Sequence, residues 1–370
     1  MEENKKKFGW GPKMRLTAGV LVFALLLSLG VNAAVGIRIS AENAQEAATN
    51  YLAENTEYVQ SGRWVRVGDK LLNLAEPVTL EEFYRKAGIQ IGEADYLGAY
   101  HSILKCMELF AGGDKDLQMD LQMKKGCLEV LLNMDEEALI SLDEALRLRP
   151  EESDAYLVKA QIQTRQGDSG ALAQTLTAYL EQKPEDREIR ELLAQTMFVL
   201  EDYTGAAAQY ERLLEELPPE EDPTLNEYLY AMTSIQIGEY ATAENYLRRA
   251  RERDGTLEGV DYYIGMCQMA QENYKDAEAS MTAAIEKNSM LQLSQYSRGV
   301  CRLMNEQPYE TAAADLKQAA GYEGEDVDPN VTEQAQKLLE ELAAAEAQVR
   351  KDAAMEAGGQ KIQITSKAEK

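Results

Sequence analysis

Histidine and cysteine are the residues in this chain whose chemistry could support catalysis or hold a metal ion, and both are scarce. His101 is the only histidine, whereas a nucleophilic serine or cysteine normally needs a histidine or lysine base beside it. The cysteines contain no Cys-x-x-Cys pair, so a zinc site is not expected. Cys267 and Cys301 occupy nearly equivalent places in two successive stretches of similar pattern, which suits two buried thiols or, alternatively, a disulfide. The other two cysteines are Cys106 and Cys127.

Carboxylates are abundant but are not arranged as an acid–base pair. Clusters such as Glu215-Glu216 and Glu220-Glu221-Asp222 are typical of solvated helix faces and loops. Gly112-Gly113 lacks the Lys-Ser or Lys-Thr that completes a phosphate-binding loop, and no segment has the spacing of an EF-hand. We therefore predict no catalytic residue, no metal site, no cofactor and no enzymatic activity.

The formal net charge is -26, and it is unevenly distributed. Residues 1–15 carry five basic and two acidic side chains, a balance of +3, so the remainder carries -29. A surface this acidic repels phosphate backbones, and nucleic-acid binding is not expected. The acidity either keeps an elongated protein soluble or selects a basic partner.

The composition indicates helices as the elements that must position any functional residues. Ala, Leu, Glu and Gln dominate, while Pro contributes 9 residues and Phe plus Trp contribute 7 of 370. Helix formers are therefore plentiful, and the aromatic and β-branched runs typical of strands are rare. We predict an all-α protein.

A regular period runs through the chain. Pro150, Pro184 and Pro218 are evenly spaced, and each closes a helix-like stretch. Mostly small residues recur at intervals of 39, 34, 34, 37, 34 and 35, and each is followed four residues later by a large apolar side chain. This spacing marks one face of a second helix in each of seven units. The recurring residues are Ala99, Ala138, Leu172, Ala206, Ala243, Ala277 and Ala312.

Two more positions recur in each unit. Twelve residues before each of these anchors lies a small residue, or Val300 beside Gly299 in the last unit, which lets the first helix approach the second closely. Tyrosine often stands three residues before the anchor, as in Tyr240-Ala241-Thr242-Ala243. With the closing prolines, this pattern resembles the tetratricopeptide-repeat family over roughly residues 80–325. The small residues are Ala87, Gly126, Ala160, Ala194, Ala231 and Gly265.

The resemblance implies a right-handed superhelical solenoid of antiparallel helical hairpins that binds a protein or peptide on its concave face. Some positions depart from the family pattern. The aromatic residue of the first helix is present as Phe83 and Tyr156 but is replaced by Arg190, Glu227 and Asp261. In this family the concave face is lined mainly by first helices, where the matching positions are Met123, Leu157, Gln161, Arg165, Gln195, Tyr228, Met232, Tyr262, Met266 and Met269. The alternative is that the apolar members of this set are core between repeats.

Residues 16–37 contain no charged side chain. A helix of 22 residues, at roughly 1.5 Å per residue, spans the roughly 30 Å hydrocarbon core of a bilayer. Basic residues 1–15 precede it and acidic residues follow, which predicts a cytoplasmic N-terminus and extracytoplasmic repeats. The alternative is a signal peptide cleaved after Ala33, which would release a secreted protein.

The remaining segments complete the predicted organisation. Residues 38–79 form either a stalk or a degenerate helical hairpin, residues 80–329 hold about seven repeats, residues 330–357 form a capping helix, and residues 358–370 form a disordered tail. We interpret the chain as a membrane-anchored bacterial scaffold for a protein or peptide partner. The alternative is an anchored or secreted chaperone-like peptide receptor, and the sequence specifies no oligomeric state.

Overall fold

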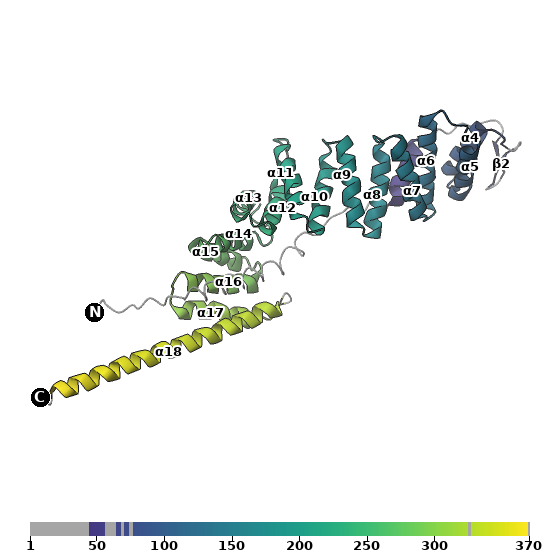
Figure 1. Cartoon of the computed structure of the whole chain (residues 1–370). Coiled ribbons are helices and arrows are strands. Elements are labelled where there is room, and N and C mark those ends of the chain that lie inside the picture. Colours follow the sequence, from purple (N-terminus) through teal and green to yellow (C-terminus); the bar gives the residue numbers. More distant parts are fainter. Residues whose placement is uncertain (1–43, 56–63, 68–69, 74–76, 325–326, 369–370) are drawn as a thin grey trace. The chain divides into compact units, whose positions relative to one another are not determined.

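The computed structural model describes residues 44–55, 64–67, 70–73, 77–324 and 327–368. Helices make up most of these ranges (Figure 1), which confirms the helical fold predicted from composition. The chain divides into two compact units, one of residues 37–209 and one that contains residues 210–370. The division falls inside one helix, α11 (Tyr203–Glu215).

The first described elements of the unit of residues 37–209 are a single helix and a two-stranded antiparallel ribbon. These are α3 (Ala44–Glu54), β1 (Trp64–Val67) and β2 (Lys70–Asn73), with Trp64 paired to Asn73. Successive antiparallel helix pairs follow in this unit. They are α4 (Leu80–Gly92) with α5 (Tyr96–Leu109), α6 (Lys115–Leu131) with α7 (Asp135–Leu148), α8 (Ser153–Gln166) with α9 (Ser169–Gln182), and α10 (Arg187–Val199), which leads into α11.

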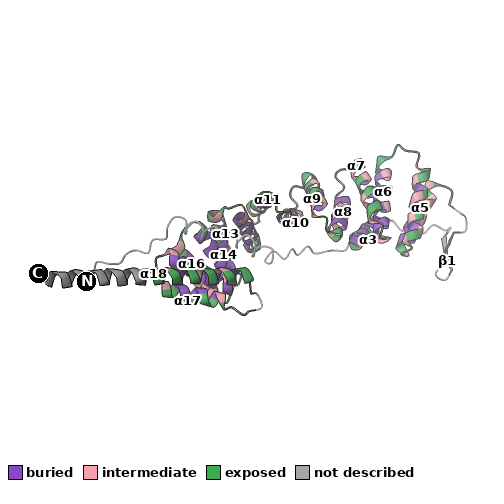
Figure 2. Cartoon of the chain, turned by 60° about the horizontal axis from the view of Figure 1, so that its bottom comes forward, coloured by how far each residue is buried: buried purple, intermediate pink, exposed green. Residues whose placement is uncertain are grey.

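The unit that contains residues 210–370 repeats the same arrangement and ends in one long helix. Within each pair the two helices contact each other, and each pair contacts the next. Figure 2 shows the buried residues of these helices in purple. The elements are α12 (Thr224–Gln236) with α13 (Tyr240–Arg253), α14 (Val260–Ala270) with α15 (Tyr274–Glu286), α16 (Leu291–Met304) with α17 (Tyr309–Ala320), and α18 (Pro329–Ala368).

Each helix pair reverses direction at a residue with left-handed backbone conformation. In the third pair, Gly167 has a φ of 72°, and the N–H of Asp168 donates to the carbonyl of Gln163 at 3.0 Å. This hydrogen bond satisfies a carbonyl that the end of α8 would otherwise leave unpaired. The same turn closes the first helix of every pair in the described residues. The residues with positive φ at these seven turns are Ala94, Asn133, Gly167, Glu201, Gly238, Glu272 and Glu306.

The small residues of the first helices are contact points with the second helices, as predicted. A β-carbon added to Gly126 would lie 3.1 Å from Leu142, and one added to Gly265 would lie 2.8 Å from Met281. The close approach of two backbones therefore depends on a residue without a side chain. In the last pair the contact to Leu316 is made by Gly299 at 3.0 Å, so the register predicted at Val300 is shifted by one residue.

Ion pairs replace the missing aromatic residue in two of the pairs. The Glu227 carboxylate is fully buried and pairs with Arg253 and, at 2.5 Å, with Arg249, both on α13. Asp261 is 3% exposed and pairs with Arg251 at 3.0 Å and with a lysine at 2.6 Å. A buried carboxylate is tolerated only when cations neutralise it. These charges thus join neighbouring helices where Phe83 and Tyr156 do so by packing.

The structure describes part of the segment 38–79, which is predicted to form either a stalk or a degenerate helical hairpin. Its described residues form α3, which packs against α6 and α8, and the strands β1 and β2. The predicted basic terminus 1–15 and the apolar segment 16–37 lie outside the described residues. Within the described ranges, no helix combines the length and the apolar composition needed to cross a membrane.

The terminal helix α18 is longer than predicted. It contacts α17 and α16 and buries Val331, Ala335 and Leu342, as expected of a helix that covers the end of an array. The predicted capping helix ends at residue 357 and is followed by a predicted disordered tail, whereas α18 continues to Ala368. Its two consecutive glycines weaken a helix but, unlike proline, remove no backbone hydrogen bond.

The turn at Gly167 provides a test of the repeat geometry. Gly167→Ala should lower the free energy of unfolding by about 1 kcal/mol, because an alanine is strained at this φ although open space surrounds it. Gly170→Ala, three residues later and inside α9, should instead raise it by up to about 1 kcal/mol. Thermal unfolding followed by circular dichroism measures both. Equal effects of the two changes would contradict the assigned turn.

Candidate peptide-binding surface

Six of the ten residues predicted to contact a partner are buried. Met123 and Met232 expose 0% of their surface and Tyr262 exposes 2%. Every residue of α14 from Val260 to Met269 is buried. These side chains pack in the interior and have almost no surface to offer a partner in this conformation. The six are Met123, Tyr228, Met232, Tyr262, Met266 and Met269.

The other four predicted residues keep accessible surface in the unit of residues 37–209. Leu157, Gln161 and Arg165 are four residues apart along α8 and therefore lie on one face of it. Arg165 pairs with Asp135, and the Oε1 atom of Gln161 is buried without a hydrogen-bond partner among the described residues. Gln195 occupies the place on α10 that is equivalent to Gln161 on α8. An accessible face with apolar, amide and cationic groups thus belongs to these two first helices.

Helix α3 already occupies part of the surface formed by first helices. It contacts α6 and α8, which are the first helices of two successive pairs (Figures 1 and 2). Its buried residues are Ala44, Ala48, Tyr51 and Leu52, a spacing that places them on one stripe. They belong to the same apolar core cluster as Met123. α3 therefore contributes to the same core in which Met123 is buried.

Polar groups surround the apolar stripe of α3. Gln45 donates from its side-chain amide to Asn133 Oδ1 at 3.1 Å, which joins the start of α3 to the turn after α6. Burial raises the pKa of the Tyr51 hydroxyl well above its ordinary value, and the negative charge of Asp120 raises it further. The tyrosine therefore stays neutral at physiological pH.

The C-terminal end of α3 lies in an unfavourable electrostatic environment. The pKa of Asp154, in the first turn of α8, is raised first by burial and then by the negative charge of Glu54, while Lys183 lowers it. A raised pKa means that the folded chain holds this proton more tightly than the unfolded chain does. This contribution to stability is present at low pH and is lost as the pH rises through the raised pKa.

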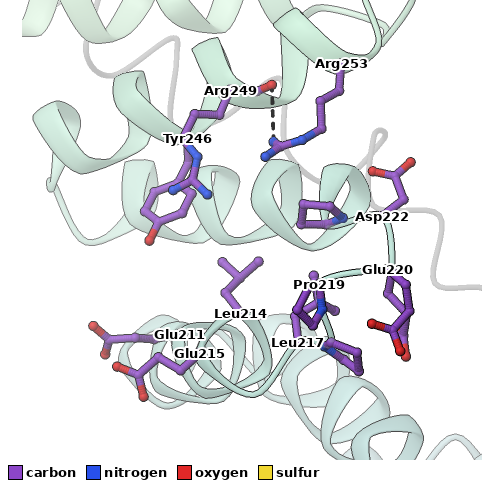
Figure 3. Close-up of a pocket in the computed structure, with 13 residues that line it drawn as sticks. Glu211, Leu214, Glu215, Leu217, Pro219, Glu220, Asp222, Tyr246, Arg249 and Arg253 are labelled. Carbon is purple, nitrogen blue, oxygen red and sulfur yellow. Dashed lines mark hydrogen bonds between the residues drawn. The ribbon is translucent and has the colours of Figure 1, made fainter.

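A separate open pocket of about 620 Å³ lies in the unit that contains residues 210–370 (Figure 3). It is formed by the end of α11, the following proline-rich loop and α13. Two of its cations are already engaged, because Arg249 and Arg253 pair with Glu227. Arg249 also lies over the Tyr246 ring, 4.8 Å from its centre. The other lining residues are mainly carboxylates and prolines, so the loop that lengthens the repeat spacing here forms the wall of the pocket.

The residues singled out for possible chemistry do not form a reactive site. The four cysteines are free, buried thiols, and burial raises the pKa of Cys127, Cys267 and Cys301. A thiol whose pKa is raised is a poor nucleophile. His101 is exposed on α5, with its ring 6.0 Å from that of Tyr100.

The packing of α3 against the first helices α6 and α8 is not predicted from the sequence. Its signal was present, because Ala44, Ala48, Tyr51 and Leu52 repeat at the spacing of one helix face. The spacing shows that the stripe must pack somewhere, but not against which helices. The contacts with α6 and α8 join residues far apart in sequence.

Comparison with known proteins agrees with the hairpin architecture. Residues 169–221 match the family model described as Tetratricopeptide repeat. This segment covers α9, α10 and α11 and the loop that follows. The chain therefore carries tetratricopeptide-repeat sequence over these residues, and the same helix pair recurs in the described residues on both sides. No curated protein matches the chain.

Solved structures with similar folds include a tetratricopeptide repeat protein from Parabacteroides merdae, 18% identical, with a TM-score of 0.37 and coverage of 70% of this chain and 98% of the other. YrrB, titled a TPR protein with an unusual peptide-binding site, is 19% identical and has a TM-score of 0.43. The match covers 53% of this chain and 97% of YrrB. PilW, titled a widely conserved type IV pilus biogenesis factor, is 17% identical and has a TM-score of 0.39. The match covers 59% of this chain and 98% of PilW.

The charge at the end of α3 can be tested by substitution. Glu54→Gln should raise the free energy of unfolding at neutral pH by about 0.2–0.5 kcal/mol, because it removes a repulsion between partly exposed carboxylates. The gain should shrink as the pH falls through the raised pKa of Asp154, where that carboxyl becomes protonated. Urea unfolding at several pH values measures it. Glu46→Gln, on an exposed position of the same helix, is the control and should show no such pH dependence.

Proposed function

We propose that the chain is a protein-interaction scaffold whose first helices bind a helical segment of a partner protein. It is further proposed to be tethered to a bacterial membrane through residues 16–37, with its helical hairpins on the extracytoplasmic side. The function rests on recognition by the repeated hairpins, because the described residues contain no cluster of side chains suited to hold a metal and their thiols are buried.

The observation that carries the proposal is the packing of α3 on α6 and α8. An amphipathic helix that lays its apolar face into a hydrophobic groove is one of the recurring modes of peptide recognition. This chain makes that contact with its own residues. The next first helix, α10, lies within the segment that matches the repeat family and presents Gln195 and Glu191 with accessible surface.

The membrane tether is supported by the sequence of residues 1–37. Five basic residues precede the uncharged segment 16–37, the order expected of a segment inserted with its N-terminus in the cytoplasm. The mass of the intact protein extracted from the membrane tests this part separately. A protein lacking residues 1–33 would show cleavage and a secreted product instead.

Site-specific photo-crosslinking in the native host tests the interaction. A photoreactive residue at Gln195 should capture one discrete protein, because this position lies on the accessible face of a first helix. The matched control is Gln174, an exposed residue on the second helix α9, which should capture none. The buried tyrosines Tyr228 and Tyr262 are unsuitable probe sites.

The pattern of captured products separates the scaffold from its alternative. One dominant product from Gln195 alone supports a dedicated scaffold. A smear of many products supports a chaperone-like peptide receptor. Equal capture from Gln195 and Gln174 would contradict binding on the first helices.

A further inference from the structure

We propose that α3 is a displaceable occupant of the partner site, and that the partner segment is an amphipathic helix of the same pattern that carries a basic residue where α3 has Glu54. We call the surface of α6 and α8 beneath α3 the docking face. This inference rests on the proposed function, because it assumes that a partner helix binds the first helices. It adds the surface that is bound and the residue pattern of the partner segment.

The apolar stripe of α3 defines what the docking face accepts. Two alanines four residues apart, Ala44 and Ala48, expose 1% and 0% of their surface, which lets the helix backbone lie close to the face. Tyr51 and Leu52 follow and expose 6% and 1%. The partner segment should therefore contain two small residues separated by three, then an aromatic residue and a leucine.

The helix pairs hold together by contacts that do not involve α3. α5 contacts α6, and α7 contacts α8, so the stack continues from pair to pair. Among the described residues, α3 is not part of a helix pair and lies against two first helices. With 11 residues it is also shorter than the roughly 12–15 residues at which an isolated helix becomes even marginally stable in water. Its departure would leave the stack intact and the docking face open.

The electrostatics of the docking face favour a partner over α3. Two carboxylates of the face approach α3, Asp120 near Tyr51 and Asp154 near Glu54. Asp120 is neutralised by Lys124. Asp154 lies in the first turn of α8, which α3 contacts, and it experiences both the like charge of Glu54 on α3 and the opposite charge of Lys183. A helix with lysine or arginine at the place of Glu54 would replace this repulsion with an attraction. The acidic face thus selects a helix with a basic C-terminal end.

Because α3 is part of the same chain as the docking face, a competing peptide needs a minimum concentration or affinity to displace it. A segment linked to its own binding site acts as if present at about millimolar concentration. Peptides that bind the open face no better than α3 are therefore excluded at cellular concentrations. A partner helix with the added cation binds a few-fold better and displaces α3 only when its own concentration approaches that millimolar value, so the occupant excludes weak or dilute ligands from the site.

The test uses the full chain and a labelled peptide. Ala48→Asp places a charge at a position with 0% exposure and should release α3, while Ala53→Asp makes the same change at an exposed position of the same helix. The probe is a fluorescent peptide of residues 42–57 with Glu54→Lys, titrated by anisotropy. It should bind the Ala48→Asp chain at least tenfold more tightly than the parent or the Ala53→Asp chain. The unchanged peptide should bind the released chain about 1.5–5-fold more weakly than the Glu54→Lys peptide.

Equal binding to all three chains, or no binding to any, would overturn the proposal. Hydrogen exchange of the unaltered chain provides a second readout that does not depend on a variant folding. The amides of α3 should exchange faster than those of α6 and α8. Exchange of all three helices at one rate would show that α3 is an integral part of the stack. Peptide binding to the released chain, without any captured product at Gln195 in the host, would confirm the docking face and contradict the wider scaffold function.

Discussion

The structure depends on one backbone constraint, the reversal of the chain within a few residues after each first helix. The reversal is made by a single residue with positive φ, and only Gly167 and Gly238 among the seven are glycines. The five others accept the strain of this conformation because the turn satisfies the last carbonyls of the helix. Only after this turn can a residue such as Gly126 meet Leu142 of the following helix.

The sequence predicts the helical fold and the repeat well, because both depend on contacts between residues close along the chain. Spacing located the glycines that face the second helices, with an error of one residue at Val300. It could not predict which side chains pair with the charged residues that replace the aromatic residue. Glu227 lies on α12 and finds both of its arginines on the following helix, α13. Those ion pairs depend on how neighbouring helices lie against each other, which a local sequence pattern does not show.

The candidate site was predicted less well for a physical reason. A first helix is packed between neighbours on several sides, so helical periodicity cannot separate its open face from its packed faces. The predicted apolar residues, such as Met232 and Tyr262, proved to be buried, whereas polar ones such as Gln195 remain accessible. Side-chain polarity would have been a better guide to accessibility than position in the repeat.

The docking of α3 also constrains how the chain can fold during its synthesis. The ribosome completes α3 at Glu54 but completes α8 only at Gln166. At about 5–20 residues per second, the roughly 110 residues between these points take roughly 6–20 s to synthesise. Throughout that interval Tyr51 and Leu52 lack part of the surface that they pack against, and a helix this short is unstable alone. The first described helix of this unit therefore cannot complete its packing until α8 has been synthesised.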